Sequence, residues 1–245
     1  VKLKELQKEN IKPYLITIKK NKNISGQVFF EKIVSKEKIY KVNNFKLDAP
    51  KDIAFLKKKK FDILLISGWQ RIIPKKILKL FKYGAIAEHG SYDYLPFGKG
   101  RSPAGWTLRK GKKIFFLHLY RATDKVDHGI IIDYKKIKIN NFDNINTLYY
   151  KIGLASAELT IKNFKNFTQK TYLKKTPKRK ESFFRKITQK DDFINWKNST
   201  DKIFNLIKAC QKPYPVAKTL LNNKILFINN AYPFDYFFKK KIKPG

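Results

Sequence analysis

The sequence has one cysteine, no methionine and no long apolar run. Cys210 stands alone among 245 residues, which excludes an intramolecular disulfide framework and any metal site built from several cysteines. No stretch approaches the roughly 18 apolar residues that a membrane-spanning helix needs, and no signal-peptide core follows the basic first residues. We therefore expect a chain without a membrane partner, in the cytoplasm, where thiols stay reduced.

Acidic residues are also scarce. Asp and Glu number 19 against 55 Lys and Arg, which gives a formal net charge of +36. Such an excess by itself suggests a polyanionic partner such as nucleic acid. However, only six of the 55 basic residues are Arg, and the lysines are scattered among abundant Asn, Ile, Phe and Tyr. That mixture is typical of an AT-rich genome, so the charge does not identify a partner.

Helical and strand patterns alternate along the first two thirds of the chain. Helical patterns cover residues 1–10, 50–60, 74–82, 102–110 and 144 to about 167, and strand patterns cover 13–18, 39–42, 61–67, 84–87, 114–121 and 129–133. The alternation predicts a doubly wound, Rossmann-like α/β domain whose ligands bind beyond the carboxyl ends of the strands. The loops that follow residues 67, 87 and 121 are expected at that edge.

A basic, polar stretch around residues 174–180 separates this domain from a smaller α+β unit. We predict a catalytic domain at residues 1–168, a linker at 169–190 and a small C-terminal domain at 191–245. A helix at 199–210 and a strand at 224–228 are expected in the C-terminal domain.

Residues 84–133 contain all three histidines and most candidate functional residues. The apolar strand 84–87 is expected to end at Glu88. His89 then begins a Gly/Pro-rich loop that runs to Gly100, which is longer than a turn requires and therefore typical of a functional loop. A short helix and a central strand follow, and a second polar loop delivers Asp127 to the next strand.

Several short motifs follow one another along this stretch. They are Ala87–Ser91 (a strand end with His-x-Ser), Leu95–Pro96, Lys99–Gly100, Pro103–Trp106, Gly111 and Asp127–Ile130. The series resembles the folate-dependent formyltransferase family, which includes methionyl-tRNA, glycinamide-ribonucleotide and amino-sugar formyltransferases. Residues 195–196, 203–209 and 213–217 resemble the later part of the same family. The resemblance covers roughly residues 61–231.

The resemblance implies transfer of a formyl group from the co-substrate 10-formyltetrahydrofolate to a primary amine, without a metal. His89 matches the family's general base and acid, and Asp127 matches the carboxylate that orients and stabilises it. Asp124 is a rival for that second role, but only Asp127 is followed by a glycine two residues on.

Two loops match the folate-binding parts of the family, the segment from Gly68 and the loop before Asp127. The candidate folate or substrate-binding residues are Gly68, Trp69, Arg71, Ile73, Lys99, Arg101, Arg121 and Asp124. Lys99 and Arg101 either hold a phosphate or a folate carboxylate, or are solvated loop charges. His118, within an apolar strand, is interpreted as a core histidine.

The chain departs from the family pattern at two positions. Ala87 stands where the family has a catalytic Asn, and Gly90 stands where it has Pro. The Asn amide helps to hold the oxyanion, and removing one such donor typically costs about 10²–10³ in rate. Either the Ser91 hydroxyl, a backbone N–H near Gly90 or protonated His89 replaces that donor, or the enzyme is slow, or the chain is a non-catalytic polyanion-binding relative.

The motifs define the acceptor amine less well. Methionyl-tRNA members carry a large barrel after the Pro-Tyr-Pro segment, whereas about thirty residues follow Pro215 here. We expect a nucleotide-linked amino sugar as the acceptor, with methionyl-tRNA as the alternative, and a homodimer is left open. Family members begin with a strand and a glycine turn that lead into the first helix, so we expect that strand to precede Val1.

Overall fold

The computed structural model describes residues 1–11, 13–19, 30–168, 179–212 and 214–234. Most of the predicted elements are present, although β3 and α3 are shorter than predicted. In chain order the elements are α1 (Lys2–Lys8), β1 (Leu15–Ile18), η1 (Lys36–Lys38), β2 (Ile39–Val42), α2 (Pro50–Lys59), β3 (Leu64–Ile66), α3 (Lys75–Leu78), β4 (Ala85–Ser91), β5 (Lys99–Gly100), α4 (Pro103–Arg109), β6 (Ile114–Arg121), β7 (Ile131–Lys138), α5 (Ile145–Asn163), η2 (Phe164–Thr168), β8 (Phe183–Phe184), η3 (Gln189–Asp192), α6 (Thr200–Ala209), β9 (Ala217–Leu221) and β10 (Lys224–Ile228).

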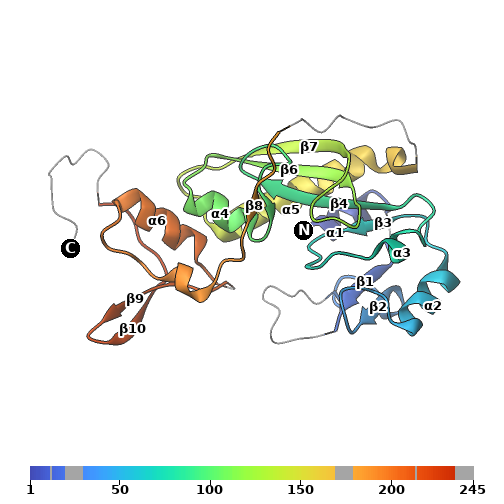
Figure 1. Ribbon diagram of the computed structural model, residues 1–245, viewed down its shortest axis with the longest axis horizontal. Coiled ribbons are helices and arrows are strands. Elements are labelled where there is room, and N and C mark those ends of the chain that lie inside the picture. Colours follow the sequence, from blue (N-terminus) through green and yellow to red (C-terminus); the bar gives the residue numbers. More distant parts are fainter. Residues whose placement is uncertain (12, 20–29, 169–178, 213, 235–245) are drawn as a thin grey trace.

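A four-stranded mixed sheet, in the order β3-β4-β6-β7, lies at the centre of the molecule (Figure 1). β3 and β4 are parallel, as the sequence predicts, whereas β6 is antiparallel both to β4 and to β7. β1 and β2 form a separate parallel pair. These layers of helices and strands confirm the α/β class.

The antiparallel strand β6 corrects one expectation about the loops. Arg121, at the end of β6, pairs with Ile86 at the beginning of β4. The loop after Arg121 therefore leaves the sheet at the edge opposite to the carboxyl end of β4. It still reaches the site, because Asp127 folds back toward His89.

The predicted end of β4 is wrong. The strand continues through Glu88, His89 and Gly90 to Ser91, which pairs with Phe116 of β6. Small and polar residues continue the strand because the ladder to β6 supplies backbone partners. At Gly90 a Cβ atom would lie 2.1 Å from Cζ of Phe115, so only glycine lets this ring pack against the strand.

The two faces of the sheet have different functions in the fold. The face that carries Ile86, Phe115, Leu117 and Leu119 packs with residues of α4 and α5 in the main hydrophobic core. The opposite face carries Ala87, His89 and Ser91, because side chains alternate along a strand. The loops before β5 and before β7 cover this second face, and the candidate site lies there.

The C-terminal part contains α6 and the antiparallel hairpin β9–β10, which makes it the small α+β unit that the sequence predicts. α6 packs against α4. Between the two helices, Nη2 of Arg109 lies 2.7 Å from Oδ1 of Asp192 and 2.9 Å from Sγ of Cys210. Burial raises the pKa of the Cys210 thiol to about 12, so the thiol is protonated at neutral pH.

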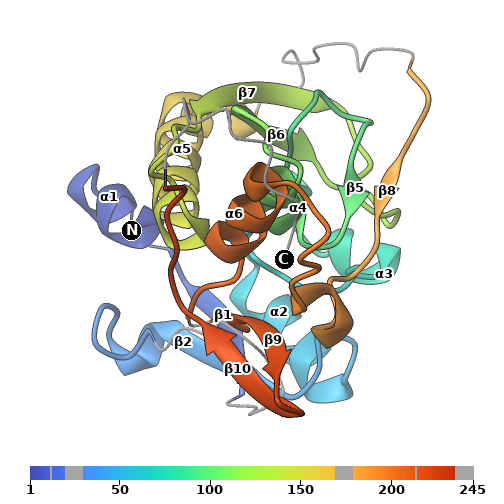
Figure 2. The same ribbon diagram turned by 90° about the vertical axis from the view of Figure 1, so that its left-hand side faces the viewer.

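Part of the predicted linker is structured. β8 pairs in parallel with β5, so the chain crosses the loop that precedes α4 (Figure 2). Residues 169–178 of the linker lie outside the described residues, as do residues 20–29 and 235–245. Within the described ranges, no helix combines the length and the apolar character needed to cross a bilayer.

Candidate active site

His89 and Asp127, the two residues that the sequence singles out for catalysis, lie together. Nδ1 of His89 is 3.3 Å from Oδ1 of Asp127, and the two side chains are 8% and 18% exposed. His89 comes from the middle of the sheet, whereas Asp127 comes from the loop between β6 and β7 and has a φ of 42°. The pair is therefore assembled from a rigid strand and a folded-back loop.

The loop between β4 and α4 connects the same two side chains. Its Gly98 carbonyl oxygen lies 2.9 Å from Nε2 of His89, and its Gly100 N–H donates to Oδ2 of Asp127 at 2.8 Å. Tyr120 donates to Oδ1 of Asp127 at 3.3 Å. Burial, and then the neighbouring Asp127, hold the pKa of Tyr120 well above its ordinary value of 10, so its hydroxyl stays protonated.

These contacts define which nitrogen of His89 carries a proton. A carbonyl oxygen can only accept, so Nε2 donates to Gly98 and is protonated in this arrangement. Nδ1 faces the Asp127 carboxylate, so each ring nitrogen of His89 has an acceptor beside it.

Ala87 and Ser91 lie on the same face of β4 as His89, one on each side of it. Ala87 is 5% exposed and packs with the apolar cluster of Leu95, Tyr120 and Ile131. Ser91 is fully buried, and its Oγ accepts a long hydrogen bond of 3.4 Å from the backbone N–H of Asp93. A polar hydroxyl is therefore present near His89, whereas the position of the family's Asn is apolar.

His118 is opposite His89 in the ladder and is a core residue, as the sequence predicts. It is fully buried, and its Nε2 accepts from the backbone N–H of Leu95 at 3.3 Å. Burial, and then the proximity of His89, lower the pKa of His118 to about 3. Its ring is therefore neutral at neutral pH and supports the loop that covers His89.

The four candidate residues after β3 differ in their surroundings. Trp69 donates from Nε1 to the Phe45 carbonyl at 2.8 Å. Trp69 and the buried Ile73 both pack in the core beside α2 and α3. Gly68 and Arg71 are exposed. β3 ends at Ile66, which pairs with Ala87, and Gly68 follows two residues after the end of this strand.

The other four candidate residues are also spread out. Lys99 is 3% exposed, and its ammonium lies 2.7 Å from Glu181. Arg101 and Asp124 are exposed. Arg121 donates to the Tyr83 and Phe167 carbonyl oxygens at 2.8 and 2.7 Å. Its guanidinium thus holds the ends of other elements in place.

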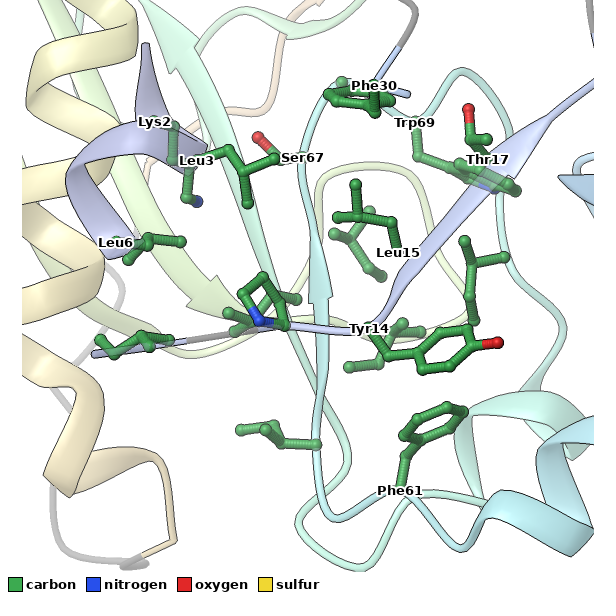
Figure 3. Close-up of a pocket in the computed structure, with 18 of the residues that line it drawn as sticks. Lys2, Leu3, Leu6, Tyr14, Leu15, Thr17, Phe30, Phe61, Ser67 and Trp69 are labelled. Carbon is green, nitrogen blue, oxygen red and sulfur yellow. The ribbon is translucent and has the colours of Figure 1, made fainter. Parts of the chain in front are cut away.

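A cavity of about 1040 Å³ lies between α1, β1 and β3 (Figure 3). Leu15, Ile66 and Ile73 are among the apolar residues of its wall, and Gly68 and Trp69 are also part of its lining. Neither His89 nor Asp127 lines it. The cavity and the His89–Asp127 pair are therefore separate features of the described residues.

Sequence reasoning missed the contacts that hold the pair. Gly98 and Gly100 act through a backbone carbonyl and a backbone N–H, which no side-chain motif reveals. The sequence did contain a hint, because a glycine stands on each side of Lys99. Gly98 and Gly100 have positive φ values of 73° and 97°, and a Cβ atom on either residue would collide with its surroundings.

Comparisons with known proteins match most of the chain to one family. The profile described as "Formyl transferase" matches residues 6–163, and the profile described as "Formyl transferase, C-terminal domain" matches residues 186–245. The chain is 34% identical over 213 residues to the bifunctional polymyxin resistance protein ArnA of Wigglesworthia glossinidia brevipalpis, a match that covers 83% of this chain and 32% of that protein. It is 33% identical over 199 residues to the methionyl-tRNA formyltransferase of Prochlorococcus marinus strain MIT 9215, covering 78% of this chain and 59% of that protein.

Two solved structures share the fold. HypX from Aquifex aeolicus, in complex with tetrahydrofolic acid, matches with a TM-score of 0.65 and 20% identity over 96% of this chain and 40% of that chain. A sugar N-formyltransferase from a Shewanella species matches with a TM-score of 0.64 and 15% identity over 80% of this chain and 78% of that chain. The chain spans less than two thirds of the length of either curated relative. The match of the first profile, which includes His89 and Asp127, covers well over half of the sequence, and the chain belongs to the formyl transferase family.

Proposed function

We propose that this protein transfers a formyl group from 10-formyltetrahydrofolate to a primary amine. The observation that carries the proposal is the buried His89–Asp127 pair, in which Nδ1 and Oδ1 lie 3.3 Å apart. Family membership supports the reaction class, because this pair occupies the motif positions to which the resemblance assigns the general base and its carboxylate.

The proton transfers in this reaction can be assigned to atoms of the pair. The amine attacks the formyl carbon, a C–N bond forms, and the bond from that carbon to N10 of the folate breaks. Nδ1 of His89 accepts the proton that the amine loses, while Gly98 keeps Nε2 protonated. Asp127 stabilises the resulting imidazolium, which then returns the proton to N10. Positioned acid–base catalysis of this kind contributes about 10²–10⁴ in rate.

The surroundings of the pair suit a folate at the exposed segment that begins at Gly68. Gly68 has a φ of 65°, and a Cβ placed there would meet no atom within 4 Å, so space is open beside its backbone. The exposed residues 123–126 precede Asp127. We propose that these two segments offer backbone groups to the pterin, and that Arg71 and Arg101, both exposed, bind anionic parts of the substrates.

For the acceptor we propose the amino group of a nucleotide-linked amino sugar. The sugar N-formyltransferase from Shewanella supports this choice at the level of the fold, since its structure spans 80% of this chain. Methionyl-tRNA is the second candidate, and both the methionyl-tRNA formyltransferase relative and the net charge of +36 favour it.

The test is a transfer assay with 10-formyltetrahydrofolate, in which release of tetrahydrofolate is followed with amino-sugar nucleotides and with methionyl-tRNA in parallel. We expect turnover with an amino sugar, its loss in His89→Ala, and retention of folate binding in that variant. Wild-type activity of His89→Ala would remove His89 from the mechanism. Absence of turnover with every amine, together with salt-sensitive RNA binding, would instead identify a polyanion-binding relative.

A further inference from the structure

A short segment of the predicted linker, residues 181–184, lies directly on the loop that holds His89 and Asp127. We call this segment the strap; it includes β8. In Figure 2 it runs beside β5, which belongs to the same loop. Three backbone hydrogen bonds attach it: Ser182 N–H to Pro96 O at 3.4 Å, Lys99 N–H to Ser182 O at 3.0 Å, and Arg101 N–H to Phe184 O at 3.0 Å.

One side chain of the strap binds the loop at Gly98. Oγ of Ser182 accepts a hydrogen bond from the Gly98 N–H at 2.9 Å. The carbonyl of the same residue, Gly98, contacts Nε2 of His89 at 2.9 Å. That carbonyl is on the Gly98–Lys99 peptide, whose N–H donates to the Ser182 carbonyl oxygen at 3.0 Å. Ser182 therefore binds the peptides on both sides of Gly98 and is separated from the His89 ring by a single residue.

The loop has little freedom to compensate for a loss of this contact by packing differently. A Cβ at Gly98 would lie 2.1 Å from Oγ of Ser91 and 2.7 Å from the Phe184 ring, so the backbone of Gly98 is clamped between β4 and the strap. Two elements far apart in sequence therefore determine the position of one carbonyl oxygen.

We propose that Ser182 is a positioning residue for His89. Its hydroxyl holds the peptide before Gly98 and the backbone bond from Lys99 holds the peptide after it, so that the Gly98 carbonyl points at Nε2 and keeps the proton of the neutral imidazole there. The proposal rests on the proposed function for its catalytic consequence, but the tautomer of His89 is a property of the resting protein. The strap therefore positions a residue of the site in addition to connecting the two units.

The experiment compares Ser182→Ala with the wild-type chain by ¹⁵N NMR of the histidine rings, with His89→Asn used to assign the His89 signals. In the wild-type protein we expect the neutral His89 ring to be protonated at Nε2 alone. In Ser182→Ala we expect a mixture of the two tautomers, because only the backbone bond from Lys99 still holds the Gly98 carbonyl and the Asp127 carboxylate beside Nδ1 favours the other tautomer. Turnover should fall about tenfold, which corresponds to about 1.4 kcal/mol, with the KM for 10-formyltetrahydrofolate unchanged.

Two matched controls separate positioning from packing. Ser182→Thr keeps the hydroxyl, and Ser182→Val has the shape of threonine without the hydroxyl. The Thr variant should therefore preserve the wild-type tautomer, and the Val variant should not. Glu181→Gln removes a different polar side-chain contact of the strap, the half-exposed ion pair with Lys99, and should leave the His89 tautomer as it is.

A single Nε2-protonated tautomer in both Ser182→Ala and Ser182→Val would overturn the proposal, whatever their stability or activity. The same is true if Thr and Val behave alike. If the tautomer changes as expected but no variant, including the wild type, transfers a formyl group, the proposed function fails while the positioning role of Ser182 stands.

Discussion

The Oγ of Ser156 lies 2.7 Å from both carboxylate oxygens of Glu88. Glu88 directly precedes His89 on β4, and its side chain points to the opposite face, where α5 packs. The ammonium of Lys2 on α1 lies 2.6 Å from the same carboxylate, which is 8% exposed. One buried carboxylate therefore joins β4, α1 and α5 immediately behind the candidate site.

Replacing Glu88 with Ala should destabilise the fold. The change leaves the Lys2 ammonium and the Ser156 hydroxyl without their acceptor. We expect a loss of about 2 kcal/mol, below the roughly 3–5 kcal/mol typical of a fully buried ion pair, because Lys2 is partly exposed. Urea unfolding measures it. As a control, Glu158→Ala removes a carboxylate from an exposed ion pair with Lys135 and should cost less than about 1 kcal/mol. Equal losses in both variants would contradict the buried role of Glu88.

Replacing Gly90 with Ala should also destabilise the fold, through steric overlap. The new methyl group would lie 2.1 Å from Cζ of Phe115, whose ring is 2% exposed and cannot move without disturbing the main core. Overpacking of this kind typically costs about 1–3 kcal/mol. The double variant with Phe115→Leu should recover part of that loss, because the ring atoms that collide are removed. Thermal unfolding of the single and double variants checks both statements, and an unchanged melting temperature in Gly90→Ala would refute them.

The sequence singled out two residues that the structure brings together, and it predicted their surroundings less well. His89 and Asp127 were found because the motif spacing marks them, and they do meet. The end of β4 was misplaced because Glu88-His89-Gly90 looks like a loop locally, while pairing with β6 keeps it in the sheet. The contact of Ser182 with Gly98 depends on the three-dimensional path of a segment more than eighty residues away, which periodicity cannot reveal.

The buried His118 should make stability depend on pH. Burial, and then His89, lower its pKa from 6.5 to about 3 in the folded protein. As the pH falls from about 6.5 toward 3, the unfolded chain takes up a proton that the folded chain does not, so the free energy of unfolding decreases.

The variant His118→Gln removes this titration and keeps an acceptor for the Leu95 N–H. Its free energy of unfolding should change less with pH than that of the wild type, by at most about 1.4 kcal/mol per pH unit. Urea unfolding at pH 7, 6 and 5 measures the difference, in which the contribution of the carboxylates common to both proteins cancels. Parallel pH profiles for the two proteins would rule out this role of His118.

The substitution Ala87→Asn tests how the site works without the family's amide. If the space at Ala87 were vacant, the new amide would restore an oxyanion donor and raise kcat by up to about 10². Ala87 is 5% exposed and packs against Leu95, Tyr120 and Ile131, so we expect the amide to crowd this apolar cluster and lower kcat. Ala87→Leu has a similar size without the amide and should lower kcat by a similar factor. Steady-state kinetics of the two variants distinguishes the two cases. A rise in kcat for the Asn variant but not for the Leu variant would contradict our expectation. It would mean that neither Ser91 nor a backbone N–H supplies the missing oxyanion donor.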